Sequence, residues 1–392
     1  MNPIFLDHHS TTPVDPRVLE AMLPYLENDF GNAASQSHLF GMKAKAAVDR
    51  ARGQVAAEIG ADAGEIVFTS GATESINLAL KGVFHASKNK GDHIVTVATE
   101  HKAVLDTCAE LERLGARVTY LPVDSRGRID LGNLRTAISD DTILVSIMAA
   151  NNEIGTLAPL EKIGEMTRRA SVLFFTDAAQ AFGKIPIDVE AMGIDLLAIS
   201  GHKIYAPKGV GALYVRGHDP KVRLMPQMHG GGHERDLRSG TLNVPGIVAL
   251  GEAARIADDE REVEGPRIAA LRDRLEMQLL ALEATHRNGD PDDRLAGNAS
   301  ITFELVPSAT LMRRARQVAV SSGSACTSAN PAPSHVLQAL GLSKEEADWT
   351  IRFGLGRFTT EEDVDQAAAA IVEAVTAIRA DSPRWEVRQA NG

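Results

Sequence analysis

The sequence is poor in cysteine, in positive charge relative to negative charge, and in long apolar runs. Its 392 residues include two cysteines, Cys108 and Cys326, too few for a disulfide framework or for a zinc site made of cysteines alone. The formal net charge of −11 argues against a general nucleic-acid or membrane-surface binder. The longest apolar runs, such as residues 142–150, are too short to span a bilayer. No basic region followed by an apolar stretch opens the chain, so we expect a reducing, cytoplasmic setting.

Short runs with β-strand character alternate with helical segments over the first 250 residues. In residues 102–115 one helical face carries Val104, Leu105, Cys108, Leu111 and Leu114. Such alternation predicts parallel βαβ units with helices on both faces of one sheet. The seven expected strands are residues 65–70, 92–98, 117–123, 142–150, 172–178, 196–201 and 211–216.

The pattern changes beyond about residue 250, where a long charged helix is expected to be interrupted near Gly265-Pro266. The elements expected after it are strands at 298–305 and 350–356 and a last helix at 361–379. The fold class is therefore α/β, with a mostly parallel seven-stranded sheet and a smaller α+β domain. We expect a large domain over 15–256 and a small domain formed by 1–14 and 257–392.

One cysteine occurs in an unusual context. Cys326 lies in the run AVSSGSACTSANPAPSH, residues 319–335, which is rich in small and polar side chains. A cysteine that only packs would normally lie among large hydrophobic residues. The residues alone leave open whether this thiol reacts, binds a metal or has no role.

Several residues with useful chemistry follow predicted strands, where ligands bind in open α/β sheets. The segment Ser70–Ser75 precedes a helix whose N-terminus favours a phosphate, although it also fits an ordinary capped turn. Lys203 follows another strand and lies beside Ser200 and His202. A partly desolvated lysine is a nucleophile suited to Schiff-base chemistry, whereas most strand-end lysines are simply solvated.

Three further side chains have a functional and an ordinary interpretation. Asp177 follows a strand and precedes Gln180 by about one helical turn; it is either a helix cap or the carboxylate partner of a pyridinium nitrogen. His101 is either a helix cap or an aromatic plane that stacks on a flat ring and moves protons. Together with Lys203 and the phosphate segment, these residues fit pyridoxal 5′-phosphate.

Nine stretches covering nearly the whole chain resemble cysteine desulfurases of the NifS/IscS type, within the class V aminotransferase superfamily. They are FLDHHSTTPVDPRVLEAM, FTSGATESINLALKG, TEHKAVLDT, NNEIGTLAPL, FTDAAQAFGKIPID, SGHKIYAPKGVGALYVR, MHGGGHERDLRSGTLNVP, AVSSGSACTSA and IRFGLGRFTTEEDVDQ. The stretch SSGSACTS resembles the long-loop, IscS-like group. The resemblance implies fold type I, a homodimer, pyridoxal 5′-phosphate as cofactor, and conversion of L-cysteine to L-alanine with an enzyme-bound persulfide.

The resemblance also implies the cofactor contacts. Lys203 corresponds to the lysine that forms the Schiff base, and Asp177 and Gln180 correspond to the partners of the ring nitrogen and ring oxygen. His101 corresponds to the histidine that stacks on the ring and transfers protons. The expected phosphate ligands are Ala72, Thr73, Ser200, His202 and Thr241 of the partner subunit.

The substrate and sulfur contacts follow from the same resemblance. Asn152 and Arg352 correspond to residues near or on the substrate carboxylate, which a guanidinium pairs through two parallel hydrogen bonds. Arg357 is a nearby alternative to Arg352. Cys326, in a small-domain loop at about 320–333, corresponds to the nucleophile that receives the sulfur, and His101 is a candidate to take its proton. No metal is expected for catalysis, and Cys326 is a candidate transient iron–sulfur ligand.

The expected sulfur acceptor is a protein, such as an iron–sulfur scaffold or a tRNA-thiolation protein, and no direct contact with nucleic acid or membrane is expected. Two other functions stay open at the level of sequence. One is a selenocysteine lyase or related class V lyase, and the other is a cofactor-bearing assembly platform. The doublet His8-His9 could suggest a metal, but adjacent histidines rarely face one ion, so we expect a structural role.

Overall fold

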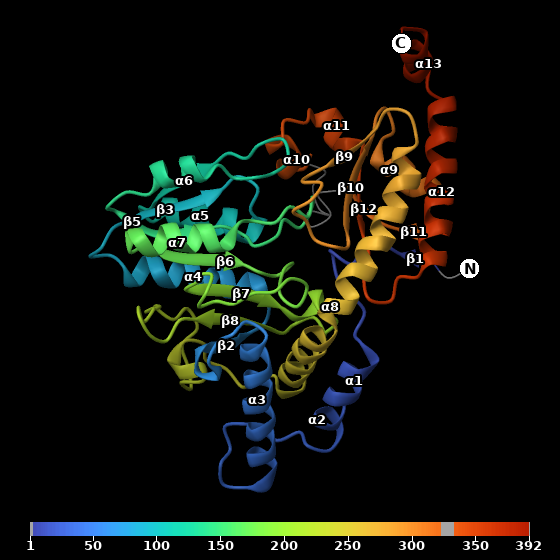
Figure 1. The fold of residues 1–392 in the computed structure, drawn as a ribbon. Helices are drawn as coiled ribbons and strands as arrows, with labels where there is room; N and C mark the ends of the chain where they lie inside the picture. Colours follow the sequence, from blue (N-terminus) through green and yellow to red (C-terminus); the bar gives the residue numbers. More distant parts are fainter. Residues whose placement is uncertain (1–2, 323–332, 392) are drawn as a thin grey trace.

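The computed structural model of the protein describes residues 3–322 and 333–391. Its largest sheet has seven strands, and each of the seven runs predicted above forms one of them. The strand order is β2-β8-β7-β6-β5-β3-β4 (Figure 1). The strands are β2 (Ile66–Thr69), β3 (His93–Val97), β4 (Arg117–Leu121), β5 (Thr142–Ser146), β6 (Leu173–Asp177), β7 (Leu196–Ser200) and β8 (Gly211–Val215).

The pairing directions confirm the expected mostly parallel sheet. Strand β8 runs antiparallel to both of its neighbours, β2 and β7, while the other four pairs are parallel. The carboxyl ends of β3, β5, β6 and β7 therefore meet at one edge. In an open α/β sheet this edge is where ligands bind.

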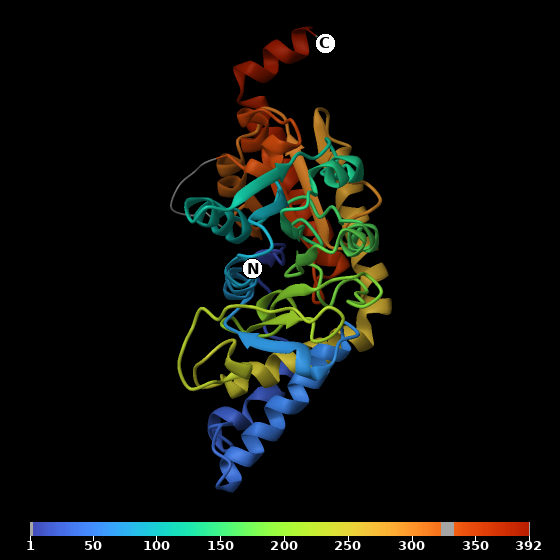
Figure 2. The same ribbon diagram turned by 90° about the vertical axis from the view of Figure 1, so that its left-hand side faces the viewer.

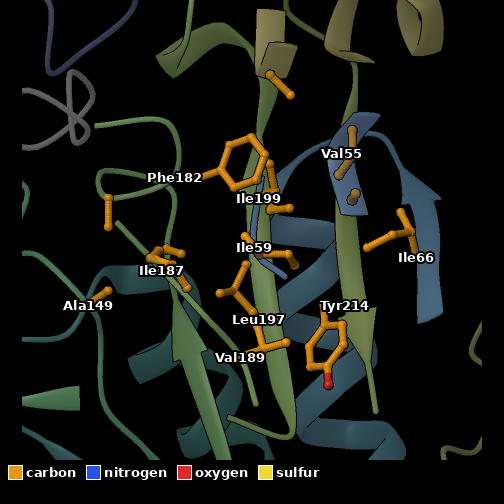
Figure 3. Packing of buried hydrophobic residues seen from close by; sticks show 14 of the residues in the cluster. Val55, Ile59, Ile66, Ala149, Phe182, Ile187, Val189, Leu197, Ile199 and Tyr214 are labelled. Atoms are coloured by element: carbon orange, nitrogen blue, oxygen red, sulfur yellow. The ribbon is translucent and has the colours of Figure 1, made fainter. Parts of the chain in front are cut away.

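Helices cover both faces of this sheet, as the alternation along β6 illustrates. Phe174 belongs to the hydrophobic cluster on one face and Phe175 to the cluster on the other, because successive strand side chains point to opposite sides. Figure 3 shows the first cluster, in which Ile59 lies near Leu197 of the sheet and Val55 lies near Ile66. The covering helices are α3 (Leu39–Ala57), α6 (Leu131–Ala137), α7 (Leu160–Ala170) and the start of α8 (Val244–Leu280) on this face, and α4 (Ala72–Ala86) and α5 (Lys102–Arg113) on the other.

A second, antiparallel sheet lies beside the first and has the order β12-β13-β10-β9. Its strands β10 and β13 and helix α12 were predicted, but α12 is not the last helix as expected, because α13 (Pro383–Asn391) follows it. A separate apolar cluster joins this sheet to α8, α9 and α12. The elements are β9 (Thr285–Asn288), β10 (Asn298–Phe303), β12 (Ser321–Ser322), β13 (Thr350–Gly354), α9 (Ser308–Arg314) and α12 (Glu361–Ala380).

The long helix α8 corrects one expectation. It runs without a break from Val244 to Leu280, with Pro266 inside it, so the predicted interruption near Gly265-Pro266 is wrong. Proline removes one helical N–H, but apolar residues on both sides of it pack into the two large clusters and hold the helix together. The helix crosses the position between 256 and 257, and the domain limits given above stay a prediction.

The N-terminal segment crosses between the two sheets. Strand β1 (Ile4–Phe5) pairs in parallel with β11 (Val318–Ala319), and Asp7 forms a β-bridge with Gly354 of β13. The N–H of Thr12 then donates to the carbonyl oxygen of His202 over 2.9 Å. Residues 7–12 are thereby fixed between the second sheet and the end of β7.

The remaining helices lie mainly at the periphery. Leu114, expected on the apolar face of α5, is instead 52% exposed because the helix ends at Arg113. In both ribbon views α3 and α13 mark opposite ends of the molecule (Figures 1 and 2). No helix within residues 3–322 and 333–391 is long and apolar enough to cross a membrane. The peripheral helices are α1 (Pro16–Met22), α2 (Pro24–Glu27), α10 (His335–Ala339), α11 (Lys344–Asp348) and α13 (Pro383–Asn391).

Candidate active site

A cavity of about 420 Å³ lies at the carboxyl edge of the large sheet. This volume is within the range of small-ligand sites, roughly 300–1,000 Å³. Its wall is built from the ends of β3, β5, β6 and β7, the start of α4, the N-terminal segment and β13. The predicted site residues that line it are Ala72, Thr73, His101, Asn152, Asp177, Gln180, Ser200, His202, Lys203 and Arg352.

Two predicted residues are not among those lining the cavity. Thr241 is exposed and lies just before α8. Cys326 lies outside the residues that the structure describes. The expected roles of these two residues therefore stay predictions.

The amine of Lys203 is held at the cavity wall by backbone carbonyls. Lys203 ends the short 3-10 turn that follows β7. Its Nζ donates to the carbonyl oxygen of His9 over 2.5 Å and to that of Ser10 over 2.8 Å. A half-buried amine fixed in this way is placed to react with a carbonyl group inside the cavity.

Asp177 ends β6 as a buried carboxylate, 4% exposed, and accepts a hydrogen bond from the N–H of Ala179 over 2.9 Å. Burial raises its pKa, while His101 and Lys203 pull the pKa down. A second carboxyl group, that of Glu100, has its pKa raised by burial and then by the nearby charge of Asp177. A cationic ring N–H in the cavity would give Asp177 the positive partner that stabilises a buried charge.

His101 is both a helix cap and a cavity residue, so its two interpretations are compatible. Its Nδ1 accepts the N–H of Ala103 over 3.1 Å at the start of α5. Because Nδ1 accepts, a neutral ring carries its proton on Nε2. The cap therefore fixes the tautomer and orientation of an imidazole at the cavity wall.

The start of α4 forms the anion-binding end of the cavity. Gly71 caps the helix with φ of 150°, a conformation that side chains rarely adopt, and the first-turn N–H groups follow it. The first-turn carboxylate of Glu74 is occupied by Arg238 Nε at 2.8 Å and by the N–H of Ser70 at 2.7 Å. Burial and nearby lysines lower the pKa of His202 to about 4, so it acts as a neutral hydrogen-bonding group. A phosphate fits this end.

The structure distinguishes between the two candidate arginines. Arg352 is 1% exposed, and its Nη atoms donate to Asn152 O at 2.7 Å and Ser10 Oγ at 2.7 Å. Since side chains alternate along β13, Arg352 faces away from the core that Ile351 and Phe353 enter. Arg352 has one acidic partner, Asp7, and lines the cavity, whereas Arg357 lies outside the cavity and pairs with Asp15 and Glu264. Arg352 is therefore the arginine placed to meet a ligand carboxylate.

Sequence reasoning gave no site role to the N-terminal segment, yet His9 and Ser10 line the cavity beside Lys203. Glu153 was not singled out either, and it does not line the cavity. It lies next to Asn152, is 4% exposed, and its Oε2 accepts from Ser334 Oγ over 2.5 Å. These residues lie in FLDHHSTTP and NNEIGT, two of the stretches that carry the family resemblance. That resemblance was the signal in the sequence that could have pointed to them.

These side chains match the groups of pyridoxal 5′-phosphate. A helix N-terminus and neutral polar side chains suit the phosphate, the buried carboxylate of Asp177 suits the ring nitrogen, and the amine of Lys203 suits the aldehyde. A guanidinium remains for a substrate carboxylate.

Comparison with known proteins agrees with this geometry. The family model described as "Aminotransferase class-V" matches residues 4–367. The chain belongs to the class-V aminotransferase family. Enzymes of this family use pyridoxal 5′-phosphate, which is the cofactor of this protein. The fold type and cofactor predicted from the sequence are thereby confirmed.

Within the class-V aminotransferase family, the similarity extends to named cysteine desulfurases. "Cysteine desulfurase IscS" of Anaeromyxobacter sp. (strain Fw109-5) is 56% identical over 386 residues, which cover 98% of this chain and 95% of the relative. A solved "NIFS-LIKE PROTEIN" is 38% identical with a TM-score of 0.89, covering 95% of this chain and 99% of its own. A structure titled "SspA in complex with cysteine" is 38% identical with a TM-score of 0.80, covering 91% and 99%. The resemblance to NifS/IscS-type enzymes is confirmed, and the selenocysteine lyase alternative is not favoured.

Proposed function

We propose that the protein is a cysteine desulfurase that converts L-cysteine to L-alanine and keeps the sulfur on Cys326 as a persulfide. The carbon–sulfur bond of the substrate breaks, and a sulfur–sulfur bond to the Cys326 thiol forms. The observation that carries this proposal is that Lys203, Asp177 and Arg352 line one cavity in a chain 56% identical to a cysteine desulfurase.

When bound, pyridoxal 5′-phosphate supplies an electron sink for breaking bonds at the substrate carbons. The residues of the chain bind and orient the substrate and the cofactor and move protons between them. Arg352 binds and orients the substrate carboxylate, with Asn152 beside it, and Gln180 meets the ring oxygen. Asp177 stabilises a proton on the ring nitrogen. His101, with its tautomer set by the α5 cap, moves protons within the cavity.

The active site is completed in a homodimer. Thr241 is exposed in the single chain, and this exposure supports the expectation, taken from the resemblance, that it reaches the phosphate of the neighbouring subunit. Such a site depends on assembly, because each cavity lacks one phosphate ligand without the partner. We also propose a cytoplasmic setting, which agrees with the low cysteine content.

The sulfur leaves to an external protein thiol, such as that of an iron–sulfur scaffold or a tRNA-thiolation protein. The other cysteine, Cys108, is fully buried on α5, and burial raises its pKa to about 12. Since the thiolate is the reactive form, Cys108 cannot accept sulfur at neutral pH.

The test is to treat the enzyme with L-cysteine without reductant and to map modified peptides by mass spectrometry. We expect one alanine per site, one extra sulfur on the Cys326 peptide, and none on the Cys108 peptide. Cys326→Ser should give no persulfide, and the matched control Cys108→Ser should behave as the parent. A persulfide on Cys108, or full turnover by Cys326→Ser, would refute the proposal.

A further inference from the structure

His9 lies directly behind the candidate cofactor site. It is 3% exposed and lines both the active-site cavity and a second cavity that contains Lys184, Glu264 and Arg357. Its main-chain and ring atoms both contact Gln180. No role follows for this histidine from the reaction described above.

The carbonyl of His9 determines which way the Gln180 amide points. The two amide positions of a glutamine differ only in that one is a nitrogen donor and the other an oxygen acceptor. One of them lies 2.9 Å from the carbonyl oxygen of His9. A carbonyl oxygen can only accept, so this position is Nε2 and the other is Oε1.

The His9 ring holds the opposite end of the same amide. Nδ1 of His9 lies 2.9 Å from Gln180 Oε1, and Lys184 Nζ approaches this oxygen to 3.4 Å. Because Oε1 only accepts, Nδ1 must carry a hydrogen. Burial, followed by the nearby charges of Lys184 and Arg352, lowers the pKa of His9 well below its ordinary value. The ring is therefore neutral, and Nε2, which has no hydrogen-bond partner among the described residues, is unprotonated.

One donor of Gln180 remains. Its Nε2 carries two hydrogens, of which the carbonyl oxygen of His9 takes one, and within residues 3–322 and 333–391 no further acceptor contacts it. Gln180 lines the active-site cavity. A ligand oxygen is therefore the natural acceptor for the second hydrogen.

We propose that His9 is a positioning residue that locks the Gln180 amide, so that its remaining N–H meets the ring oxygen of the cofactor. This inference rests on the proposed function, because it takes Gln180 as a cofactor contact. Lys203 Nζ also donates to the carbonyl of His9. His9 therefore positions both Gln180 Nε2 and Lys203 Nζ, the two donors that we expect on the same side of the cofactor ring.

Truncation of the ring tests this role without moving the main chain. His9→Ala keeps the carbonyl that Lys203 and Gln180 use but removes Nδ1. His9→Asn places an amide nitrogen near the position of Nδ1 and should restore the lock. His8→Ala is the matched control, because His8 is also buried but its Nδ1 contacts the carbonyl oxygen of Gly354 at 2.9 Å instead.

The first readout is binding of pyridoxal 5′-phosphate to cofactor-free protein, followed by a pH titration of the visible absorption of the bound form. Loss of one hydrogen bond should weaken binding of the cofactor by His9→Ala about threefold to tenfold. The pH of the spectral change should shift in His9→Ala, while His9→Asn and His8→Ala should stay near the parent. In Gln180→Ala, adding His9→Ala should have no further effect.

Several results would overturn the inference. They are parental cofactor binding and an unshifted spectrum in His9→Ala, or an additive effect in the double variant. Nitrogen NMR of the parent, with His9→Asn used to assign the signal, gives a check independent of folding. We expect the Nδ1–H form of the His9 ring, and an Nε2–H form would refute the lock. If the parent itself neither binds the cofactor nor forms alanine, the proposed function fails instead.

Discussion

Replacing Arg352 with lysine tests the substrate end of the cavity while keeping the positive charge. The guanidinium of Arg352 is fixed before any ligand binds, since it donates to Asn152 O, Ser10 Oγ, Ser321 Oγ and Asp7 Oδ1. Lysine has a single nitrogen on a flexible stem and cannot present two parallel N–H groups to a carboxylate. The change therefore removes the bidentate geometry more than the charge.

The size of the effect follows from the number of lost contacts. A hydrogen bond to a charged group contributes about 1.5–3 kcal/mol, and we expect Arg352→Lys to lose one such bond to the substrate carboxylate. Since about 1.4 kcal/mol corresponds to a factor of ten, kcat/KM for L-cysteine should fall about tenfold to one-hundredfold. The inhibition constant of L-alanine, which carries the same carboxylate, should rise by a similar factor.

Arg357→Lys is the matched control. Arg357 is nearly as buried, but it pairs with Asp15 at 2.8 Å and Glu264 at 2.9 Å and lies over the ring of Tyr205. We expect its replacement to lower the unfolding midpoint in urea and to leave KM and alanine inhibition unchanged. If Arg352→Lys binds cysteine and alanine as the parent does, or if Arg357→Lys shows the larger KM change, the assignment of the carboxylate site is wrong.

Four further outcomes are expected. Lys203→Ala should fold as the parent does but lose alanine formation and the visible absorption of the lysine-linked cofactor, as spectra and circular dichroism will show. Asp177→Asn should keep bound cofactor, measured by its release in alkali, yet form alanine more slowly, because the ring nitrogen is less readily protonated. Mixing inactive Lys203→Ala with Thr241→Trp should restore about a quarter of parental activity after subunit exchange if Thr241 acts across the dimer; no recovery would contradict this. Burial raises the pKa of Glu153 to about 7, so the folded protein holds a proton that the unfolded chain has released, and this contribution to stability is lost as pH rises from about 4.5 to 7. Between pH 5 and 7 the parent should lose about 2 kcal/mol more of unfolding free energy than Glu153→Gln, measured with urea.

The parts of the fold that follow local patterns could be predicted. Most strands of the large sheet are short runs rich in apolar and β-branched residues, so their positions follow from the sequence, whereas their order in the sheet was not predicted. The placement of Asp177, Ser200 and Lys203 follows from the same rule, because they lie at or just after the ends of strands that share one carboxyl edge. A local strand pattern and the rule that ligands bind at the carboxyl edge are sufficient to predict where these residues lie.

Other features depend on contacts between distant segments. Pro266 signals a helix end, yet α8 continues through it because apolar residues on either side pack in two separate clusters. The polar strand β9 has no local signature and forms by pairing with β10. His9 contacts Gln180, 171 positions away, and no pattern around either residue reveals the pair.

The N-terminal segment also has a consequence for the order of events during biosynthesis. Asp7 accepts a hydrogen bond from Ser321, 314 positions later, and strand β1 forms a two-stranded sheet with β11. At a translation rate of about 5–20 residues per second, roughly 15–60 s pass between the synthesis of these two partners. During that time the strands of the large sheet can leave the ribosome together with the contacts of His9 to Gln180 and Lys203, but Ser10 lacks its partner Arg352. A nascent chain stalled before β13 would therefore carry Lys203 in a cavity that lacks Arg352, the side chain expected to meet the substrate carboxylate.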